Sequence, residues 1–279
     1  MSEIELSVGP IEYGDTGGDG PVLVFMHGLT MDGSVWRKVV PGLPGYRCLT
    51  PTWPVGSHRK PMHPDADLSL RNLALLIDEF LAELDLSDVT LVLNDCGGGQ
   101  VLLSEGRADR VGRLVLTSCE AFDNYPPGLP GKLLIVACRI PGGFRFLMNL
   151  FRFRIFRRAP TSWGWMSKRP VPTEVMDDWF RPSQDQPEIR RDLLKYVRSV
   201  PPKAKLLEWS AQMASFERPV LVAWAKEDKL MPIEHGSRLA KLFPDARLVE
   251  IEDSYTLIPE DQPDVLAALI RDFVPAHVP

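Results

Sequence analysis

The chain has 279 residues, of which 44% are hydrophobic and 25% are charged, and its formal net charge is −5. This length fits one domain with an inserted segment better than two independent domains, and the composition is that of an ordinary globular protein. The acidic balance argues against nucleic acid as a partner, because surfaces that bind nucleic acid are usually basic.

The cysteine spacing and the N-terminal residues indicate whether the protein binds a metal, forms disulfides or is exported. Cys48, Cys96, Cys119 and Cys138 lack the CxxC or Cys/His spacing of a zinc site or a disulfide framework, so we expect free thiols and no metal site. Residues 1–6 are acidic where a signal peptide would be basic, and the chain has no uninterrupted run of about 18 apolar residues. The cytoplasm is therefore the expected location.

Apolar runs and helical periodicity alternate along most of the chain. Strands buried on both faces are predicted from continuous apolar runs at residues 21–27, 89–93, 114–117, 220–224 and 247–251. Segments with helical periodicity lie between them, for example at 70–84 and 236–242. This alternation predicts an α/β fold with a mostly parallel sheet, in which ligands bind beyond the carboxyl ends of the strands.

The alternation stops at residues 123–215, where we predict a helical cap inserted between core segments 1–122 and 216–279. No acidic residue occurs between Asp123 and Glu174, and the stretch is rich in phenylalanine. Its basic residues include Arg139, Arg145, Arg152, Arg154, Arg157, Arg158, Lys168 and Arg169. A basic amphipathic helix can lie on a membrane surface, but we favour a cap helix with its apolar face over a substrate pocket and its arginines in water.

Residues 94–99 have the pattern of a nucleophile elbow. Asn94-Asp95-Cys96-Gly97-Gly98-Gly99 follows a predicted strand and precedes a helical stretch at 100–105. Such a turn is strained and needs small residues two positions before and after the nucleophile. Gly97 therefore puts Asp95 at the nucleophile position, although Leu93 departs from the pattern. The alternative is that Asp95 only caps the following helix.

With these motifs in place, the chain resembles the α/β-hydrolase superfamily over nearly its full length. His27-Gly28-Leu29, residues 51–56, the elbow, residues 228–232 and residues 261–265 follow the family order. Haloalkane dehalogenases and epoxide hydrolases of this superfamily carry aspartate at the elbow. The resemblance implies that Asp95 attacks an sp³ carbon and that a water activated by histidine hydrolyses the resulting ester.

The resemblance also implies roles for other residues. It implies an oxyanion hole from the backbone N–H groups of Leu29 and Cys96, and a structural role for His27. It offers two positions for the acid, Glu120 and Asp228, and leaves both open. A haloalkane dehalogenase is not expected, because the family's halide-binding Asn and Trp positions are Leu29 and Cys96 here.

The histidine position of the family falls on Thr256, and threonine cannot act as a general base near neutral pH. None of the other histidines is an obvious substitute, and we leave open that His58 or His63 reaches the mouth of the pocket. In a catalytic triad the acid orients the histidine, so without a histidine neither Glu120 nor Asp228 has that role. The sequence therefore predicts an atypical catalytic triad.

We predict an enzyme that acts on a small or medium apolar organic substrate, with Asp95 as nucleophile or general base. The reaction is hydrolysis of an epoxide, ester or carbon–halogen bond, or lyase chemistry. The alternative is a ligand-binding protein that retains the cavity without catalysis. We expect no cofactor, because the glycines after Asp95 do not form a GxGxxG motif, and we leave a homodimer open.

Overall fold

The computed structural model describes residues 1–95, 98–160 and 162–275. In these residues eight strands form one sheet in the order β1-β2-β4-β3-β5-β6-β7-β8. The strands are β1 (Ser2–Leu6), β2 (Gly9–Asp15), β3 (Val22–Met26), β4 (Arg47–Pro51), β5 (Val89–Asn94), β6 (Val111–Thr117), β7 (Val220–Ala225) and β8 (Ala246–Ile251). The strands from β4 to β8 run parallel, which confirms the predicted α/β fold.

Three strands were not predicted, and they lie together at one edge of the sheet. β1 and β2 form an antiparallel hairpin, and β2 pairs antiparallel with β4. The side chains of β2 alternate between buried and partly exposed positions, since this edge is covered less completely than the centre. Continuous apolar runs mark only strands that are buried on both faces, so this edge lacks that signal.

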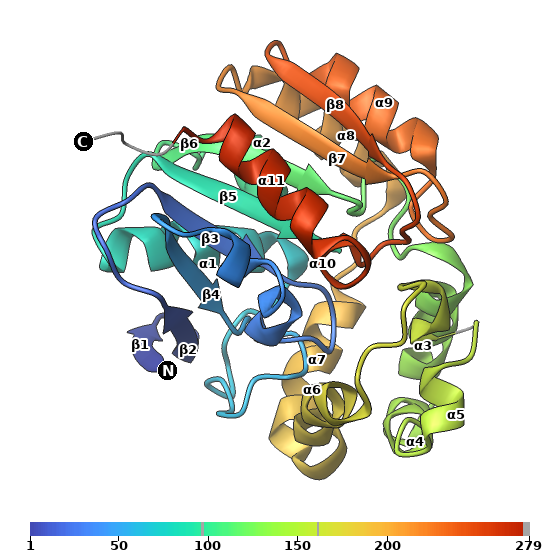
Figure 1. The fold of residues 1–279 in the computed structure, drawn as a ribbon. Coiled ribbons are helices and arrows are strands. Elements are labelled where there is room, and N and C mark those ends of the chain that lie inside the picture. Colours follow the sequence, from blue (N-terminus) through green and yellow to red (C-terminus); the bar gives the residue numbers. More distant parts are fainter. Residues whose placement is uncertain (96–97, 161, 276–279) are drawn as a thin grey trace.

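Helices cover both faces of the sheet, with α11 (Pro263–Phe273) in front of it and α1 (Leu70–Glu83) behind it in Figure 1. The Ser69 hydroxyl caps α1 by accepting the N–H of Asn72. The helix buries residues at three- and four-residue spacing, namely Leu70, Leu73, Ala74, Leu76, Ile77, Phe80 and Leu81. The other helices of the predicted core are α2 (Val101–Ser104), α9 (Ile233–Leu242) and α10 (Ile258–Asp261).

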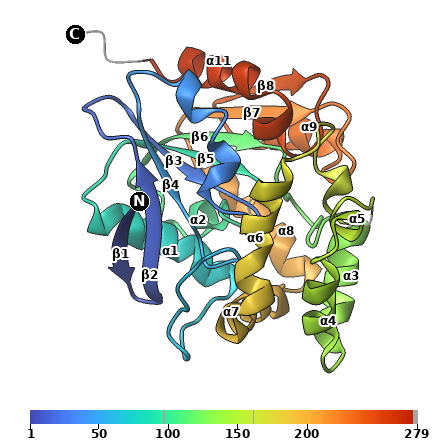
Figure 2. The same cartoon turned by 60° about the horizontal axis from the view of Figure 1, so that its bottom comes forward.

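The predicted cap contains only helices and turns in its described residues. Its helices are α3 (Gly128–Arg139), α4 (Gly143–Leu150), α5 (Arg154–Arg157), α6 (Thr173–Asp185), α7 (Pro187–Arg198) and α8 (Lys203–Gln212). Helices α3, α4, α6 and α7 pack on one another, whereas α8 packs on α2. Figure 2 shows α3 to α7 grouped on one side of the sheet. No helix in the described parts of the chain is long and apolar enough to cross a membrane.

Candidate active site

Asp95 lies directly after β5 in a backbone conformation that few non-glycine residues adopt. Its φ angle is +42°, and its N–H donates to the carbonyl oxygen of Ser118 at 3.2 Å. A left-handed conformation at aspartate is strained, and such strain is common at functional sites. Cys96 and Gly97, to which we assigned an oxyanion-hole N–H and the elbow glycine, lie outside the described residues.

Gly28 makes room for Asp95. A Cβ atom at position 28 would lie 2.0 Å from Oδ2 of Asp95 and 2.4 Å from its carbonyl oxygen. Any side chain there would collide with the carboxylate or displace the turn. The glycine after His27 is therefore a steric requirement of the elbow.

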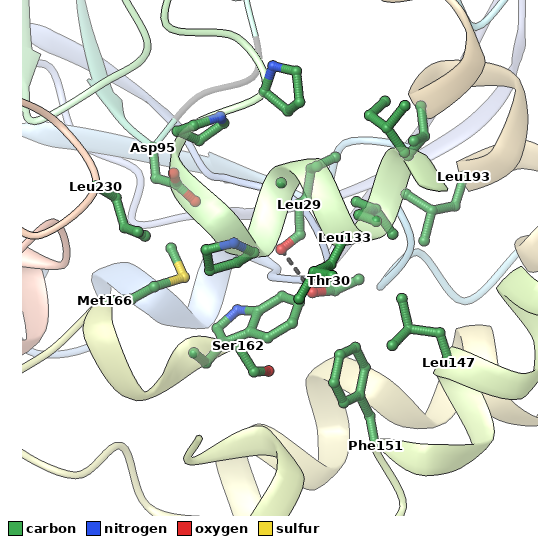
Figure 3. A pocket seen from close by; sticks show the side chains of 18 of the residues that line it. Leu29, Thr30, Asp95, Leu133, Leu147, Phe151, Ser162, Met166, Leu193 and Leu230 are labelled. Carbon is green, nitrogen blue, oxygen red and sulfur yellow. Dashed lines mark hydrogen bonds between the residues drawn. The ribbon is translucent and has the colours of Figure 1, made fainter. Parts of the chain in front are cut away.

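The alternative that Asp95 caps the next helix does not fit the geometry. α2 begins at Val101, one residue later than the predicted helical stretch, and its N-cap is Gln100. Asp95 is instead buried and lines a cavity of about 210 Å³. In Figure 3 its carboxylate lies at one side of this cavity, across from Leu147 and Phe151.

Apolar side chains dominate the cavity wall. Among the described lining residues, the only carboxylic acids are Asp95 and Glu120, and none is a histidine. The apolar lining comes from the core and the cap, and it includes Leu29, Leu133, Leu134, Ile135, Leu147, Met148, Phe151, Trp163, Met166, Leu193 and Leu230. The chamber therefore favours an apolar ligand whose reactive group reaches the two acids.

The electrostatics of these acids favour their protonated forms. Burial raises the pKa of Asp95 well above its usual value, and the charges of Glu120 and Asp228 add to this shift. Burial raises the pKa of Glu120 to about 7, although a backbone hydrogen bond opposes the shift. Because several acids share one poorly solvated region, the site can hold and release a proton near neutral pH.

Glu120 is held by its backbone. Gln100 donates from Nε2 to the carbonyl oxygen of Glu120 at 2.6 Å. Oε2 of Glu120 is buried without a hydrogen-bond partner among the described residues. The side chain thus has an acceptor available to a ligand or a water molecule.

Asp228 contacts Thr256, the residue at the predicted histidine position. Oδ1 of Asp228 accepts the Thr256 hydroxyl at 2.8 Å and the N–H groups of Leu230 and Met231 at 2.9 Å each. Burial raises the pKa of Asp228, and these hydrogen bonds oppose the shift. Asp228 therefore orders its own loop, while Glu120 lines the cavity.

Thr256 is fully buried near the end of β5. Its carbonyl oxygen accepts Nδ2 of Asn94, the residue before Asp95, at 2.7 Å. A threonine hydroxyl at this place donates its proton to Asp228 and cannot accept a second one from water near neutral pH.

His27 bonds with the backbone around it. Nε2 accepts the N–H of Trp53 at 2.9 Å, so Nδ1 donates to the carbonyl oxygen of Gly28 at 3.0 Å. Burial lowers its pKa to about 4, so the ring is neutral at pH 7. It connects the loop after β3 to the loop after β4.

The other described histidines, His58, His63 and His235, do not line the cavity. The expectation that His58 or His63 reaches the pocket is wrong, because neither is among the described residues that line it. His58 is buried against Asp192 at 3.3 Å, and His63 is exposed at 3.4 Å from Glu5. His235 packs on the ring of Phe122, and His277 lies outside the described residues.

Two polar cavity residues were missed in the sequence. Thr30 adopts a φ of +51°, and its hydroxyl donates to the carbonyl oxygen of Leu29 at 2.7 Å. Ser162 has a buried hydroxyl without a hydrogen-bond partner in the described residues. The position of Thr30 after His27-Gly28-Leu29 is a usable signal, whereas nothing in the sequence around Ser162 marks it.

Residues 23–269 match the α/β-hydrolase family, and the chain belongs to this family. It is 29% identical to a cis-3-alkyl-4-alkyloxetan-2-one decarboxylase of Xanthomonas campestris, over 95% of this chain and 92% of that protein. It is 23% identical to a haloalkane dehalogenase of Mesorhizobium japonicum, over 99% and 92%.

A solved structure of the haloalkane dehalogenase DbeA of Bradyrhizobium elkani has the same fold, with a TM-score of 0.75. The identity is 19%, and the match covers 98% of each chain. These relatives confirm the predicted resemblance to the dehalogenase branch and the prediction of a hydrolase-like enzyme.

Proposed function

We propose that this enzyme acts on a small or medium apolar organic substrate, with Asp95 as nucleophile or general base and Thr256 at the histidine position. The observation that carries the proposal is the buried Asp95 carboxylate, placed on a left-handed turn against an apolar cavity. The described lining residues include no imidazole to activate water. We therefore propose a reaction that proceeds without that base.

Nucleophilic attack by Asp95 on an sp³ carbon would form an alkyl ester. Hydrolysis of such an ester normally needs a water activated by histidine. Thr256 cannot supply that activation, so an ester formed here either persists or breaks down without water. Breakdown without water requires a substrate in which cleavage of another bond expels the Asp95 carboxylate as a leaving group.

The substrate in the name of the Xanthomonas relative has this property. It is a four-membered cyclic ester with two alkyl chains. Attack of the Asp95 carboxylate on ring carbon C4 breaks the C4–O bond and frees the ring carboxylate. Cleavage of the C2–C3 bond then releases CO₂, forms the C3=C4 double bond and expels the Asp95 carboxylate. The sum is one lactone converted to one alkene and CO₂, with no water consumed.

The cavity suits both the two alkyl chains and the negative charge that forms when the ring opens. Its wall is apolar, and protonated Glu120 can donate a hydrogen bond to the carboxylate released from the ring. We therefore propose lyase chemistry on a strained cyclic ester as the function that these residues support best.

Product analysis and intact-protein mass spectrometry test this proposal. We expect alkene and CO₂ from a cis-dialkyl β-lactone, and a persistent covalent adduct with alkyl halides or epoxides. Asp95→Asn should abolish both results, while Asp67→Asn, at a surface carboxylate, should change neither. Absence of turnover and adduct on all substrates, with apolar ligands still bound, would instead support the ligand-binding alternative.

A further inference from the structure

The cap exposes a concentration of large apolar side chains. Eleven such side chains are exposed in the described residues, and eight of them lie between positions 129 and 156. These eight form what we call the cap patch: Leu129, Leu133, Val136, Ile140, Phe146, Phe153, Ile155 and Phe156, exposed by 41–76%. Figures 1 and 2 both place their helices, α3, α4 and α5, side by side. A clustered apolar surface of this kind usually marks an interaction site.

Helix α3 is apolar on two faces. Leu129, Leu133 and Val136, followed by Ile140 just after the helix, are spaced by four, three and four residues and form one outward stripe. The inward face carries Leu134 and Ile135, which line the cavity. A cap helix over a pocket needs only the inward face to be apolar. Leu129, Val136 and Ile140 do not line the cavity, so their exposure has a different purpose from roofing it.

The charge around the patch has one sign. Residues 124–173 contain no Asp or Glu and nine Lys or Arg, within a chain of net charge −5. Lys132, Arg139 and Arg145, on or next to the patch helices, are exposed and have no ion-pair partner among the described residues. Arg152 and Arg154 do pair, with Asp185 and Asp177. Exposed aromatic and aliphatic side chains beside unpaired cations are the composition of a surface that binds anionic membranes.

The patch is continuous with the cavity. Leu133 and Phe156 belong to the exposed patch and also line the cavity that contains Asp95. A bilayer in contact with the patch would therefore also lie against two residues of the cavity wall.

We propose that the cap patch docks on an anionic lipid bilayer, with the cavity-lining side chains of Leu133 and Phe156 toward the lipid. A second copy of the chain fits the patch less well, because two like-charged basic faces repel each other. The inference concerns the surface alone and holds whatever reaction Asp95 performs.

Vesicle flotation of the full chain tests the proposal without an activity assay. We expect binding to phosphatidylcholine vesicles that contain phosphatidylglycerol, little binding to phosphatidylcholine alone, and loss of binding as salt is raised. Each cation near an anionic surface strengthens binding about fivefold, so the double variant Arg139→Gln/Arg145→Gln should bind roughly twentyfold more weakly. Phe153→Ser/Ile155→Ser should also weaken binding.

Matched surface changes outside the cap serve as controls. Val265→Ser and Lys241→Gln alter an exposed apolar residue and an exposed cation on α11 and α9, and neither should change flotation. Failure to bind anionic vesicles overturns the proposal, as does binding that both cap double variants leave unchanged. Concentration-dependent dimerisation without lipid, lost in the same variants, would assign the patch to a second copy instead. Circular dichroism melting confirms that each variant is folded.

Discussion

The hydroxyl of Thr256 donates a 2.8 Å hydrogen bond to Oδ1 of Asp228. Asp228 is one of the two acid positions that the sequence offers, and Thr256 is at the position predicted for histidine. The hydrogen bond has the arrangement expected between an acid and a histidine, but a threonine hydroxyl cannot take a proton from water near neutral pH. Four predictions follow from this arrangement and from the acids near it.

Replacing Thr256 with His should let the protein hydrolyse an ester formed on Asp95. Asp228 can accept a hydrogen bond from an imidazole, which orients the ring and stabilises its protonated form. We expect the adduct with an alkyl halide to decay in Thr256→His and to persist in the wild type, as followed by intact-protein mass spectrometry. Thr256→Val, which cannot activate water, is the control, and equal adduct lifetimes in all three proteins would contradict the prediction.

Replacing Gly28 with Ala should disrupt the elbow. The new Cβ would meet both the carboxylate and the carbonyl oxygen of Asp95, so the turn has to move. We expect a loss of about 1–3 kcal/mol in the free energy of unfolding, measured with urea, and loss of alkylation at Asp95. Gly17→Ala has open space around the new methyl group, but its φ of +68° strains any side chain. It therefore controls for backbone strain away from the site and should leave alkylation intact. Unchanged alkylation in Gly28→Ala would show that the contact is not needed.

Glu120 should make the fold less stable as pH rises. Its pKa is raised from 4.5 in the unfolded chain to about 7 in the folded protein, so between these pH values the folded state binds more protons. Stability attributable to this group is therefore present below pH 4.5 and lost progressively toward pH 7, by up to about 3 kcal/mol. Urea unfolding of the wild type and Glu120→Gln at pH 5 and pH 8 measures this difference. The variant should show a smaller fall, and parallel curves would count against a buried, ionisable Glu120.

The same substitution should shift the pH dependence of Asp95 chemistry. Burial is the main reason for the raised pKa of Asp95, and the charge of Glu120 is the next. Attack requires the ionised carboxylate, so alkylation by an alkyl halide should accelerate as pH rises. Removing the charge in Glu120→Gln should move this rise to lower pH. Alkylation rates measured at a series of pH values give the profile. Glu105→Gln, at the C-terminal end of α2 and paired with Arg71, should leave the profile unchanged. Identical profiles for Glu120→Gln and the wild type would contradict electrostatic coupling of the two acids.

Patterns of residues adjacent in the sequence were sufficient to predict the central strands and the elbow. Continuous apolar runs predicted β3, β5, β6, β7 and β8, because strands buried on both faces need apolar side chains throughout. The run into residues 94–99 placed Asp95 on a turn, and the positive φ of Asp95 agrees with a strained elbow. Strands β1, β2 and β4 were missed because polar residues interrupt them, so none of them forms a continuous apolar run.

The amino-acid sequence by itself determined the fold class, the carboxylate after β5 and the threonine at residue 256, since each depends on residues adjacent along the chain. Only the tertiary structure decided which acid faces the cavity, that His58 pairs with Asp192, and that α3 is apolar on its outer face as well. These depend on how segments far apart in the chain pack together. Burial and proximity, which set the pKa values of Asp95 and Glu120, exist only after that packing.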